Sequence, residues 1–336
     1  MAKLKSPKTY LLFDSANTFF RARHVVRGDD ISVKTGLALH ICMNSVKKCW
    51  ERFKADHVIF CFEGRSWRKD FYAPYKQNRK ESRDALTPAE QEADKIFWET
   101  FDEFKNFVTD KTNCTVLQHG QLEADDLIAG WTQAHPDDKH IIVSSDSDFY
   151  QLINENISQY NGITDTHITD KGYFDEHGND IIDKKTKEPK TPPNPAWLLF
   201  EKCMRGDSSD NVFSAFPKVR KTKLQEAFND RHNQGFTWNN MMLSRWLDHH
   251  GKEKIVKDEY NTNQQLIDLT KQPDHIKEII FDTISVTTKS PKQVANVGIH
   301  MLKFCSRHDL VRIRDNVKFY AEPFNARLNQ DQTITA

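Results

Sequence analysis

The sequence lacks several features that mark common classes of protein. Its six cysteines form no CxxC pair, which argues against both a zinc site and a disulfide framework. No run of about 18 uncharged apolar residues occurs, so no segment is expected to span a membrane. Met1 to Tyr10 also lacks the apolar stretch of a signal peptide. We therefore expect a cytoplasmic globular protein whose thiols stay reduced.

An excess of charge of one sign is absent too. Lys plus Arg and Asp plus Glu each number 48, giving a formal net charge of zero. This balance argues against a uniformly basic nucleic-acid coat but leaves local basic patches open. With 336 residues, 38% hydrophobic and 29% charged, the chain is long and apolar enough for one large domain or two smaller ones.

Acidic residues follow three short apolar runs that we interpret as buried strands. The runs at 9–13, 57–62 and 139–143 have the length and composition of strands in a parallel sheet. The acids that come after them are Asp14, Glu63, Asp146 and Asp148. Open α/β folds place their sites at the carboxyl edge of the sheet, where such acids would meet. The alternative for Asp14 is a helix N-cap, and the alternative for Asp146 and Asp148 is a polar turn.

Further acids occur in a similar context. Three of them begin a predicted helix after a short strand at 115–118, and two more are three residues apart and could share a helix face. These five are Glu123, Asp125, Asp126, Asp207 and Asp210. Clustered carboxylates cannot all be ionised without cations, and hard divalent ions prefer oxygen ligands. Two such ions about 3.5–4 Å apart can drive phosphodiester hydrolysis, which makes this chemistry the one we expect.

Two cationic segments indicate a polyanionic ligand. Residues 65–83 interleave basic side chains with Trp67, Phe71, Tyr72 and Tyr75, as single-stranded nucleic acid requires. The cations of this segment are Arg65, Arg68, Lys69, Lys76, Arg79, Lys80 and Arg83. A second group at the start of a predicted helix consists of Lys218, Arg220, Lys221 and Lys223. A solvated basic loop is the alternative for the first segment.

A charged, proline-rich stretch at 184–195 predicts a hinge between two domains. We place the boundary so that an N-terminal α/β domain covers residues 1–190 and a helical domain covers 191–336. Apolar spacing predicts helices over 35–54 and 88–108 in the first domain, and amphipathic helical stretches from 238 to 318 in the second.

Six segments, taken in order, resemble the motifs of the 5′-nuclease family, which includes flap endonucleases and the 5′-nuclease domain of bacterial DNA polymerase I. They are FDSAN (13–17), CFEG (61–64), YKQNR (75–79), LEADDLIA (122–129), SSDSDF (144–149) and RGDSSDNV (205–212). The stretch WRKDFYAPYKQNR (67–79) is particularly similar to the enzymes of T-even-type bacteriophages. The resemblance implies an α/β fold with a mostly parallel central sheet flanked by helices. It also implies a helical arch at about 64–90 and a C-terminal helix-hairpin-helix domain.

The resemblance also implies a role for each matching residue. Two magnesium ions (or manganese) are expected. The first is held directly or through water by Asp14, Glu63, Glu123, Asp125, Asp126 and Asp146, and the second by Asp148, Asp207 and Asp210. Lys76 would contact the scissile phosphate, with Arg79 as its basic neighbour. The chain departs from the family pattern at Glu63, where Asp is common, and at 214–221, where the usual hairpin glycines are missing.

The implied function is a phage replication 5′→3′ exonuclease and flap endonuclease with ribonuclease H activity, working in the cytoplasm of an infected bacterium. It would remove RNA primers and adjacent DNA from lagging-strand fragments. Expected ligands are DNA and RNA–DNA duplexes with 5′ ends or flaps. Expected partners are a single-stranded-DNA-binding protein and a sliding clamp, and the protein itself would be a monomer. The alternatives are a PIN-type endoribonuclease of single-stranded RNA, a non-catalytic structure-specific nucleic-acid-binding protein, and a small-molecule phosphatase.

Overall fold

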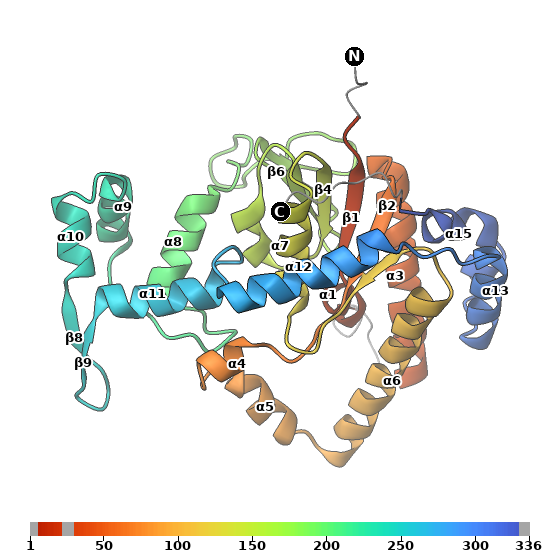
Figure 1. The fold of residues 1–336 in the computed structure, drawn as a ribbon, viewed down its shortest axis with the longest axis horizontal. Helices are drawn as coiled ribbons and strands as arrows, with labels where there is room; N and C mark the ends of the chain where they lie inside the picture. The colour runs from red at the N-terminus through yellow and green to blue at the C-terminus, as the bar shows by residue number, and fades with distance from the viewer. Residues whose placement is uncertain (1–5, 22–29, 329–336) are drawn as a thin grey trace. The chain divides into compact units, whose positions relative to one another are not determined.

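The structure is a computed structural model that describes residues 6–21 and 30–328. It divides into two compact units (Figure 1). Unit 1 is formed by Met1–Ser66, Leu86–Pro192 and Glu278–Ala336, and unit 2 by Trp67–Ala85 and Pro193–Lys277. The predicted boundary at residue 190 lies next to the junction at Pro192. The units differ from the predicted domains in two places, because residues 67–85 group with unit 2 and the helices from residue 278 onward group with unit 1.

Unit 1 is built on a seven-stranded sheet with the order β3-β2-β1-β4-β5-β6-β7. The strands are β1 (Thr9–Asp14), β2 (His57–Cys61), β3 (Thr115–Leu117), β4 (Lys139–Val143), β5 (Ile157–Asn161), β6 (Thr166–Thr169) and β7 (Gly172–Phe174). All pairs among strands β1 to β5 are parallel. Strand β6 runs antiparallel to both of its neighbours, β5 and β7. The strand order changes direction between β1 and β4, which is the kind of switch point where α/β sheets bind ligands.

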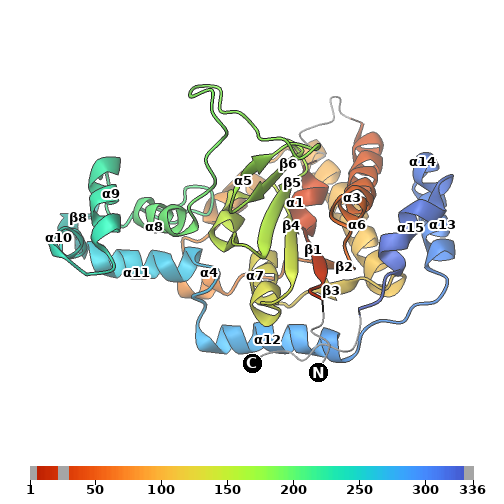
Figure 2. The same ribbon diagram turned by 90° about the horizontal axis from the view of Figure 1, so that it is seen from above.

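Helices cover both faces of this sheet (Figure 2). They are α1 (Ser15–Phe20), α3 (Ile31–Phe53), α6 (Pro88–Asp110), α7 (Ala124–Ala134), the 3₁₀ helix η1 (Ser147–Leu152), α12 (Asp274–Lys289), α13 (Val297–Arg307), α14 (Val311–Arg314) and α15 (Val317–Asn325). Side chains alternate along a strand. Leu11 and Phe13 therefore join the core beneath α3 and α6, while Tyr10 meets Trp131 of α7 edge-on at 5.4 Å between ring centroids. The predicted fold class, a mostly parallel sheet flanked by helices, is confirmed.

The last helices belong to unit 1 because they complete its core. Phe304 of α13 stacks on Phe107 of α6 at 4.5 Å between centroids, and Phe324 of α15 stacks on Phe60 of β2 at 6.1 Å. On the opposite face of the sheet, Gly130 of α7 lies against Ile280 of α12. These contacts link residues between 150 and 264 positions apart, so local periodicity does not reveal them.

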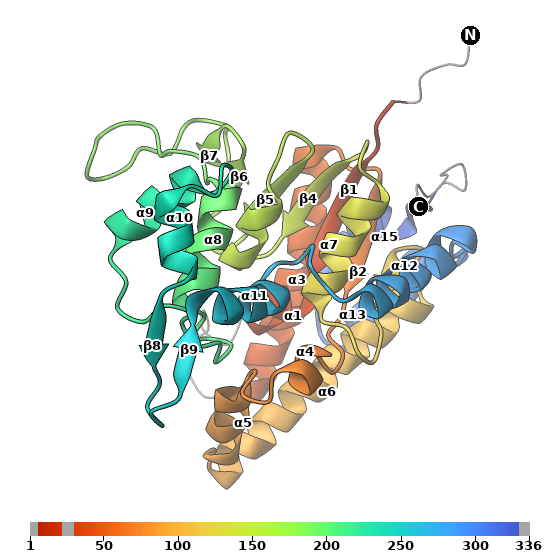
Figure 3. The same ribbon diagram turned by 60° about the vertical axis from the view of Figure 1, so that its left-hand side comes forward.

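Unit 2 is mainly helical (Figure 3) and has a hydrophobic core of its own. It contains α4 (Arg68–Phe71), α5 (Gln77–Asp84), α8 (Pro195–Arg205), α9 (Lys221–Asp230), α10 (Phe236–Met242), the strands β8 (Arg245–Leu247) and β9 (Glu253–Ile255), and α11 (Val256–Ile267). The core includes Phe200, Leu224, Phe228 and Met241.

The β8–β9 hairpin departs from the predicted helical run in unit 2. Asp248 shapes its turn by accepting hydrogen bonds from the amides of His250 and Lys252, and Gly251 adopts a φ of 74°. Its strands are three residues long. Strands this short do not produce the alternation by which a sequence reveals a strand.

The cysteines and the helices bear on two further features of the chain. All six cysteines are buried free thiols. Among the described helices, none combines the length and the apolar character needed to cross a membrane.

Candidate active site

Asp14 ends the central strand β1 and is 5% exposed. Its Oδ1 accepts a hydrogen bond from the amide of Asn17 at 3.1 Å, so it caps α1 as the alternative reading proposed. Its Oδ2 accepts from the Ser144 hydroxyl at 2.8 Å, just past the end of β4. The two strands at the switch point are thus joined through the Asp14 carboxylate.

Asp146 lies beyond the end of β4 and caps the 3₁₀ helix η1. Its amide donates to the Ser144 hydroxyl at 3.1 Å, and its Oδ1 accepts from the Asp148 amide at 2.9 Å. The extended backbone ends at Asp146, which places Asp148 in the first turn of η1. The segment after β4 is therefore a short 3₁₀ helix that begins at Ser147.

A third group of acids surrounds the start of α7. The Oε2 of Glu63, just after β2, accepts from the Ala124 amide at 3.2 Å. Glu123 is 3% exposed, and its Oε2 accepts from the Ser66 hydroxyl at 2.8 Å. Asp126 is fully buried and accepts from the Glu123 amide. Glu123 and Asp126 together cap the start of α7.

The pKa of the Cys61 thiol is affected by carboxylates at the carboxyl edge of the sheet. Burial raises the pKa of Cys61 well above its ordinary value, and the carboxylates of Asp14, Asp125 and Glu63 raise it further. These acids come from three separate elements, so the fold brings them within electrostatic range of one buried atom. Asp14 at the end of β1, Glu63 after β2 and Asp125 in α7 thus lie near one another in unit 1, and their roles as ligands stay predictions.

The chemistry of these side chains fits a hard divalent cation, because every donor is a carboxylate oxygen. In residues 6–21 and 30–328, however, no three His, Cys, Asp or Glu side chains are gathered into a coordination shell. Amides and hydroxyls hold the carboxylates of Asp14, Glu63, Glu123 and Asp146 instead. The acids fit an ion by donor type and by position, and the sequence-based ligand assignments stay predictions.

The remaining acids of the predicted set lie in unit 2. Asp207 and Asp210 occupy a turn closed by backbone pairing of Asp207 with Val212, and not a shared helix face. Gly206 precedes this turn with a φ of 78°, and a Cβ there would lie 2.3 Å from the carbonyl oxygen of Val212. The turn therefore requires glycine at this position.

Cations surround both acids of the turn. Burial would raise the pKa of Asp207, but the Lys202 ammonium 2.8 Å away and the Ser209 hydroxyl and amide hold it below its usual value. Asp210 has Arg79 at 2.5 Å and Lys76 at 3.7 Å. Its Oδ2 also accepts from the Tyr75 hydroxyl at 3.0 Å. The predicted arch residues thus contact the turn that carries Asp210.

The residues of the first basic segment that are predicted to contact nucleic acid include both exposed and buried side chains. Arg65, Lys69 and Arg79 are exposed. Arg68 is 1% exposed and its Nε donates to the carbonyl of Leu266, while Tyr75 is 5% exposed. The burial of these two side chains does not support direct contact with a ligand. They hold α4 and the start of α5 within unit 2.

The second cationic group is exposed throughout, at Lys218, Arg220, Lys221 and Lys223. Lys218 has a φ of 58°, a conformation that favours glycine. The backbone therefore makes a left-handed turn in the segment where the family pattern places glycines, although the residue is lysine.

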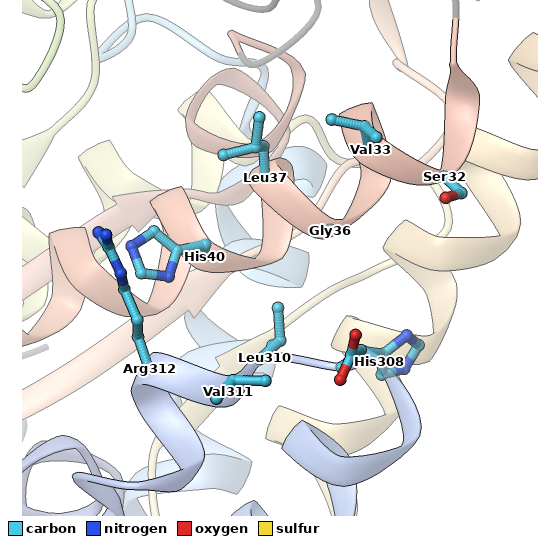
Figure 4. Close-up of a pocket in the computed structure, with 10 residues that line it drawn as sticks. Ser32, Val33, Gly36, Leu37, His40, His308, Leu310, Val311 and Arg312 are labelled. Atoms are coloured by element: carbon cyan, nitrogen blue, oxygen red, sulfur yellow. The ribbon is translucent and has the colours of Figure 1, made fainter.

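Sequence reasoning missed three polar residues that hold the acids. Ser66 and Ser144 lie beside or within the quoted motifs, so a search for hydroxyls next to the acids would have found them. Gln159 lies on β5 and gives no local signal. A separate groove of about 420 Å³ lies between the start of α3 and the α13–α14 segment (Figure 4). Its lining, which includes His40, His308 and Arg312, contains none of the predicted site residues.

The fold and the site together define a class: an α/β protein with carboxylates gathered at the switch point of a mostly parallel sheet. Residues 9–179 match the family model of the 5′–3′ exonuclease N-terminal, resolvase-like domain. The chain belongs to this family of 5′ nucleases, as the sequence motifs predicted.

Curated relatives agree with this assignment. The ribonuclease H of Enterobacteria phage T4 is 26% identical over 285 residues, covering 76% of this chain and 79% of that protein. A flap endonuclease Xni from Psychromonas ingrahamii is 33% identical over 162 residues, or 45% of this chain. DNA polymerase I from Rhizobium leguminosarum is 27% identical over 229 residues, or 63% of this chain. The chain spans only 56% of the Xni protein and 20% of the polymerase.

Solved structures show the same fold. A bacteriophage T5 protein co-crystallized with metal ions has a TM-score of 0.55 and 17% identity, covering 94% of this chain and all of that chain. A T5 5′-exonuclease with bound divalent zinc has a TM-score of 0.57 and 18% identity over the same shares.

Proposed function

We propose that this protein is a magnesium-dependent 5′ nuclease that cuts phosphodiester bonds at flaps and near the 5′ ends of DNA and RNA–DNA duplexes. One observation carries the proposal: at the switch-point edge, the Ser144 hydroxyl joins the Asp14 carboxylate at the end of β1 to the Asp146 amide beyond the end of β4. A protein that only bound nucleic acid would gain nothing from carboxylates facing a polyanion. Family membership also favours this function over the PIN-type ribonuclease, the binding protein and the phosphatase.

The proposed ligands form two groups. Asp14, Glu63, Glu123, Asp125, Asp126 and Asp146 would hold one ion, and Asp148, Asp207 and Asp210 a second. Bound divalent ions supply an activated water and stabilise the leaving oxygen. The chain's own residues fix the carboxylates in place, through the Ser144 and Ser66 hydroxyls and the amides of Asn17 and Ala124.

The cations of the two basic segments would bind the substrate. Lys76 pairs with Asp210 in this structure, and the same ammonium would stabilise charge on the scissile phosphate. Arg65, Lys69, Arg79 and the exposed group at 218–223 would contact the backbone of the nucleic acid.

The proposed biological role is removal of RNA primers and adjacent DNA during phage replication in the host cytoplasm. Similarity to the phage T4 ribonuclease H over most of both chains supports this role. A T5 flap endonuclease with TM-score 0.55 is described as a complex with DNA and metal ions. A single-stranded-DNA-binding protein and a sliding clamp are the proposed partners of a monomeric enzyme.

The test is cleavage of a 5′-flap substrate and of an RNA–DNA duplex, with magnesium or with a chelator. Asp146→Asn should lower the rate by more than about 100-fold, because loss of outer-shell partners alone costs 10–100-fold. Asp170→Asn, an exposed acid between β6 and β7, is the matched control and should cut normally. Tight flap binding without cleavage under any divalent ion would support the binding protein. Cleavage of single-stranded RNA alone would support the PIN-type enzyme.

A further inference from the structure

Gln159 lies on β5 with no exposed surface. It pairs with Ile142 of β4, one residue before that strand ends, and its side chain reaches the loop that carries Asp146. Its Nε2 donates to the carbonyl of Ser144 at 2.9 Å and to the carbonyl of Asp146 at 2.7 Å. One amide group thus binds both ends of the segment from Ser144 to Asp146.

The orientation of this amide is fixed by its surroundings. The Oε1 of Gln159 is buried and has no hydrogen-bond partner among the described residues. The reversed amide would place that oxygen against two carbonyl oxygens, which repel it, and would lose both hydrogen bonds. Burying an unpaired acceptor is unfavourable, so the two bonds to the loop must outweigh that cost for this arrangement to persist.

The bonds from Gln159 restrain the Asp146 carboxylate. They hold the backbone on which Asp146 sits, while the Ser144 hydroxyl joins its amide to the Asp14 carboxylate. The Oδ1 of Asp146 is engaged by the Asp148 amide. With the backbone and Oδ1 both fixed, the direction of Oδ2 is set as well.

We propose that Gln159 is a positioning residue that aims Asp146, together with Asp14, at the divalent ion. The inference rests on the proposed function, since it assigns Gln159 to the outer shell of that site. Outer-shell partners orient metal ligands, and losing one weakens metal affinity even though the ligands remain. Gln159 does not itself contact the reacting groups.

The experiment measures Mn²⁺ binding to the full chain by titration calorimetry without substrate, and the magnesium dependence of flap cleavage. Gln159→Leu keeps the side-chain volume and removes both donors. It should raise the Mn²⁺ dissociation constant and the half-saturating magnesium concentration by about 10–100-fold. The KM for the flap at saturating magnesium should stay within about twofold, because the substrate contacts are untouched.

Two further variants separate positioning from folding. Ser158→Ala is the matched control, because it removes one hydrogen bond from the same strand, to His167, without touching the loop. Gln159→Glu preserves the side-chain shape but replaces the donating amide nitrogen with a carboxyl oxygen. A loss of Mn²⁺ affinity shared by Gln159→Glu and Gln159→Leu would therefore report the missing hydrogen bonds to the loop and not a packing defect.

Unchanged Mn²⁺ affinity in both Gln159 variants would overturn the inference, as would an equal loss in Ser158→Ala. A wild type that binds no divalent ion and cuts no flap would instead contradict the proposed function, and this inference with it. The calorimetry of the wild type distinguishes the two failures.

Discussion

At the scale of single residues, Lys218 combines two properties that usually belong to different amino acids. Its φ of 58° is a glycine-like conformation, which a side chain makes unfavourable by about 1–2 kcal/mol. Lys218 is exposed and precedes Arg220, the N-cap of α9, by two residues in the segment proposed to bind phosphates. The strain of a lysine at this position is consistent with a contribution from its charge.

Lys218→Gly tests that contribution without disturbing the turn. We expect duplex affinity to fall and the slope of log affinity against log salt to decrease by about 1, because one phosphate contact is lost. The melting temperature should stay the same or rise. Lys54→Gly is the control, since Lys54 ends α3 in unit 1 with a φ of 49°. If both variants lose affinity equally, or neither does, Lys218 is not a phosphate contact.

At the scale of elements, α7 links the site to the opposite side of unit 1. Its first turn carries Glu123, Asp125 and Asp126, and its middle lies against α12 at Gly130. A Cβ on Gly130 would lie 2.2 Å from the Cγ2 of Ile280 and 3.2 Å from the Cδ1 of Ile284. The packing of α12 therefore helps to decide where α7 presents its acids.

Gly130→Ala should destabilise unit 1 by about 1–3 kcal/mol, the usual cost of overpacking, even though alanine favours helices. We expect weaker Mn²⁺ binding as well, because a shift of α7 displaces its acids. Adding Ile280→Ala makes room for the new methyl group, so the double variant should be more stable than the sum of the single changes. Urea unfolding of the four proteins measures this coupling, and strict additivity would contradict the contact.

At the scale of the whole molecule, buried histidines make stability depend on pH. Burial lowers the pKa of His57 and of His140 to about 3 each, and that of His167 to about 4. At pH values between these pKa values and about 6.5, the unfolded chain binds more protons than the folded chain, because the buried imidazoles stay neutral. The stability that these residues provide is present above pH 6.5 and is lost as pH falls toward 3.

We therefore expect the free energy of unfolding to fall by about 1.4 kcal/mol per pH unit for each of these histidines, once the pH is well below 6.5. His140→Phe should reduce this slope by about 1.4 kcal/mol per pH unit, because one titrating group is removed. Phenylalanine is the replacement because His140 packs on Tyr10 and another aromatic ring can take its place. His232→Gln, at an exposed position, is the control. Denaturant unfolding from pH 7 to pH 4 gives the slopes, and an unchanged slope in His140→Phe would contradict the burial argument.

Much of unit 1 follows from the sequence. Apolar runs predicted β1, β2 and β4, and apolar spacing predicted α3 and α6, because each signal lies within one element. The acids at the strand ends could be placed together for the same reason, since parallel strands share an edge. The order of the motifs then predicted the family, which the family model confirmed.

The tertiary structure determined the features that depend on contacts between different elements. It placed Asp207 and Asp210 in a turn, buried Arg68 and Tyr75, and returned the last helices to unit 1. It also brought Gln159 to the loop of Asp146. These features depend on contacts between distant segments, whose energies are set by packing and hydrogen bonding. Periodicity along the chain determines which face of an element is buried, but not what that face meets.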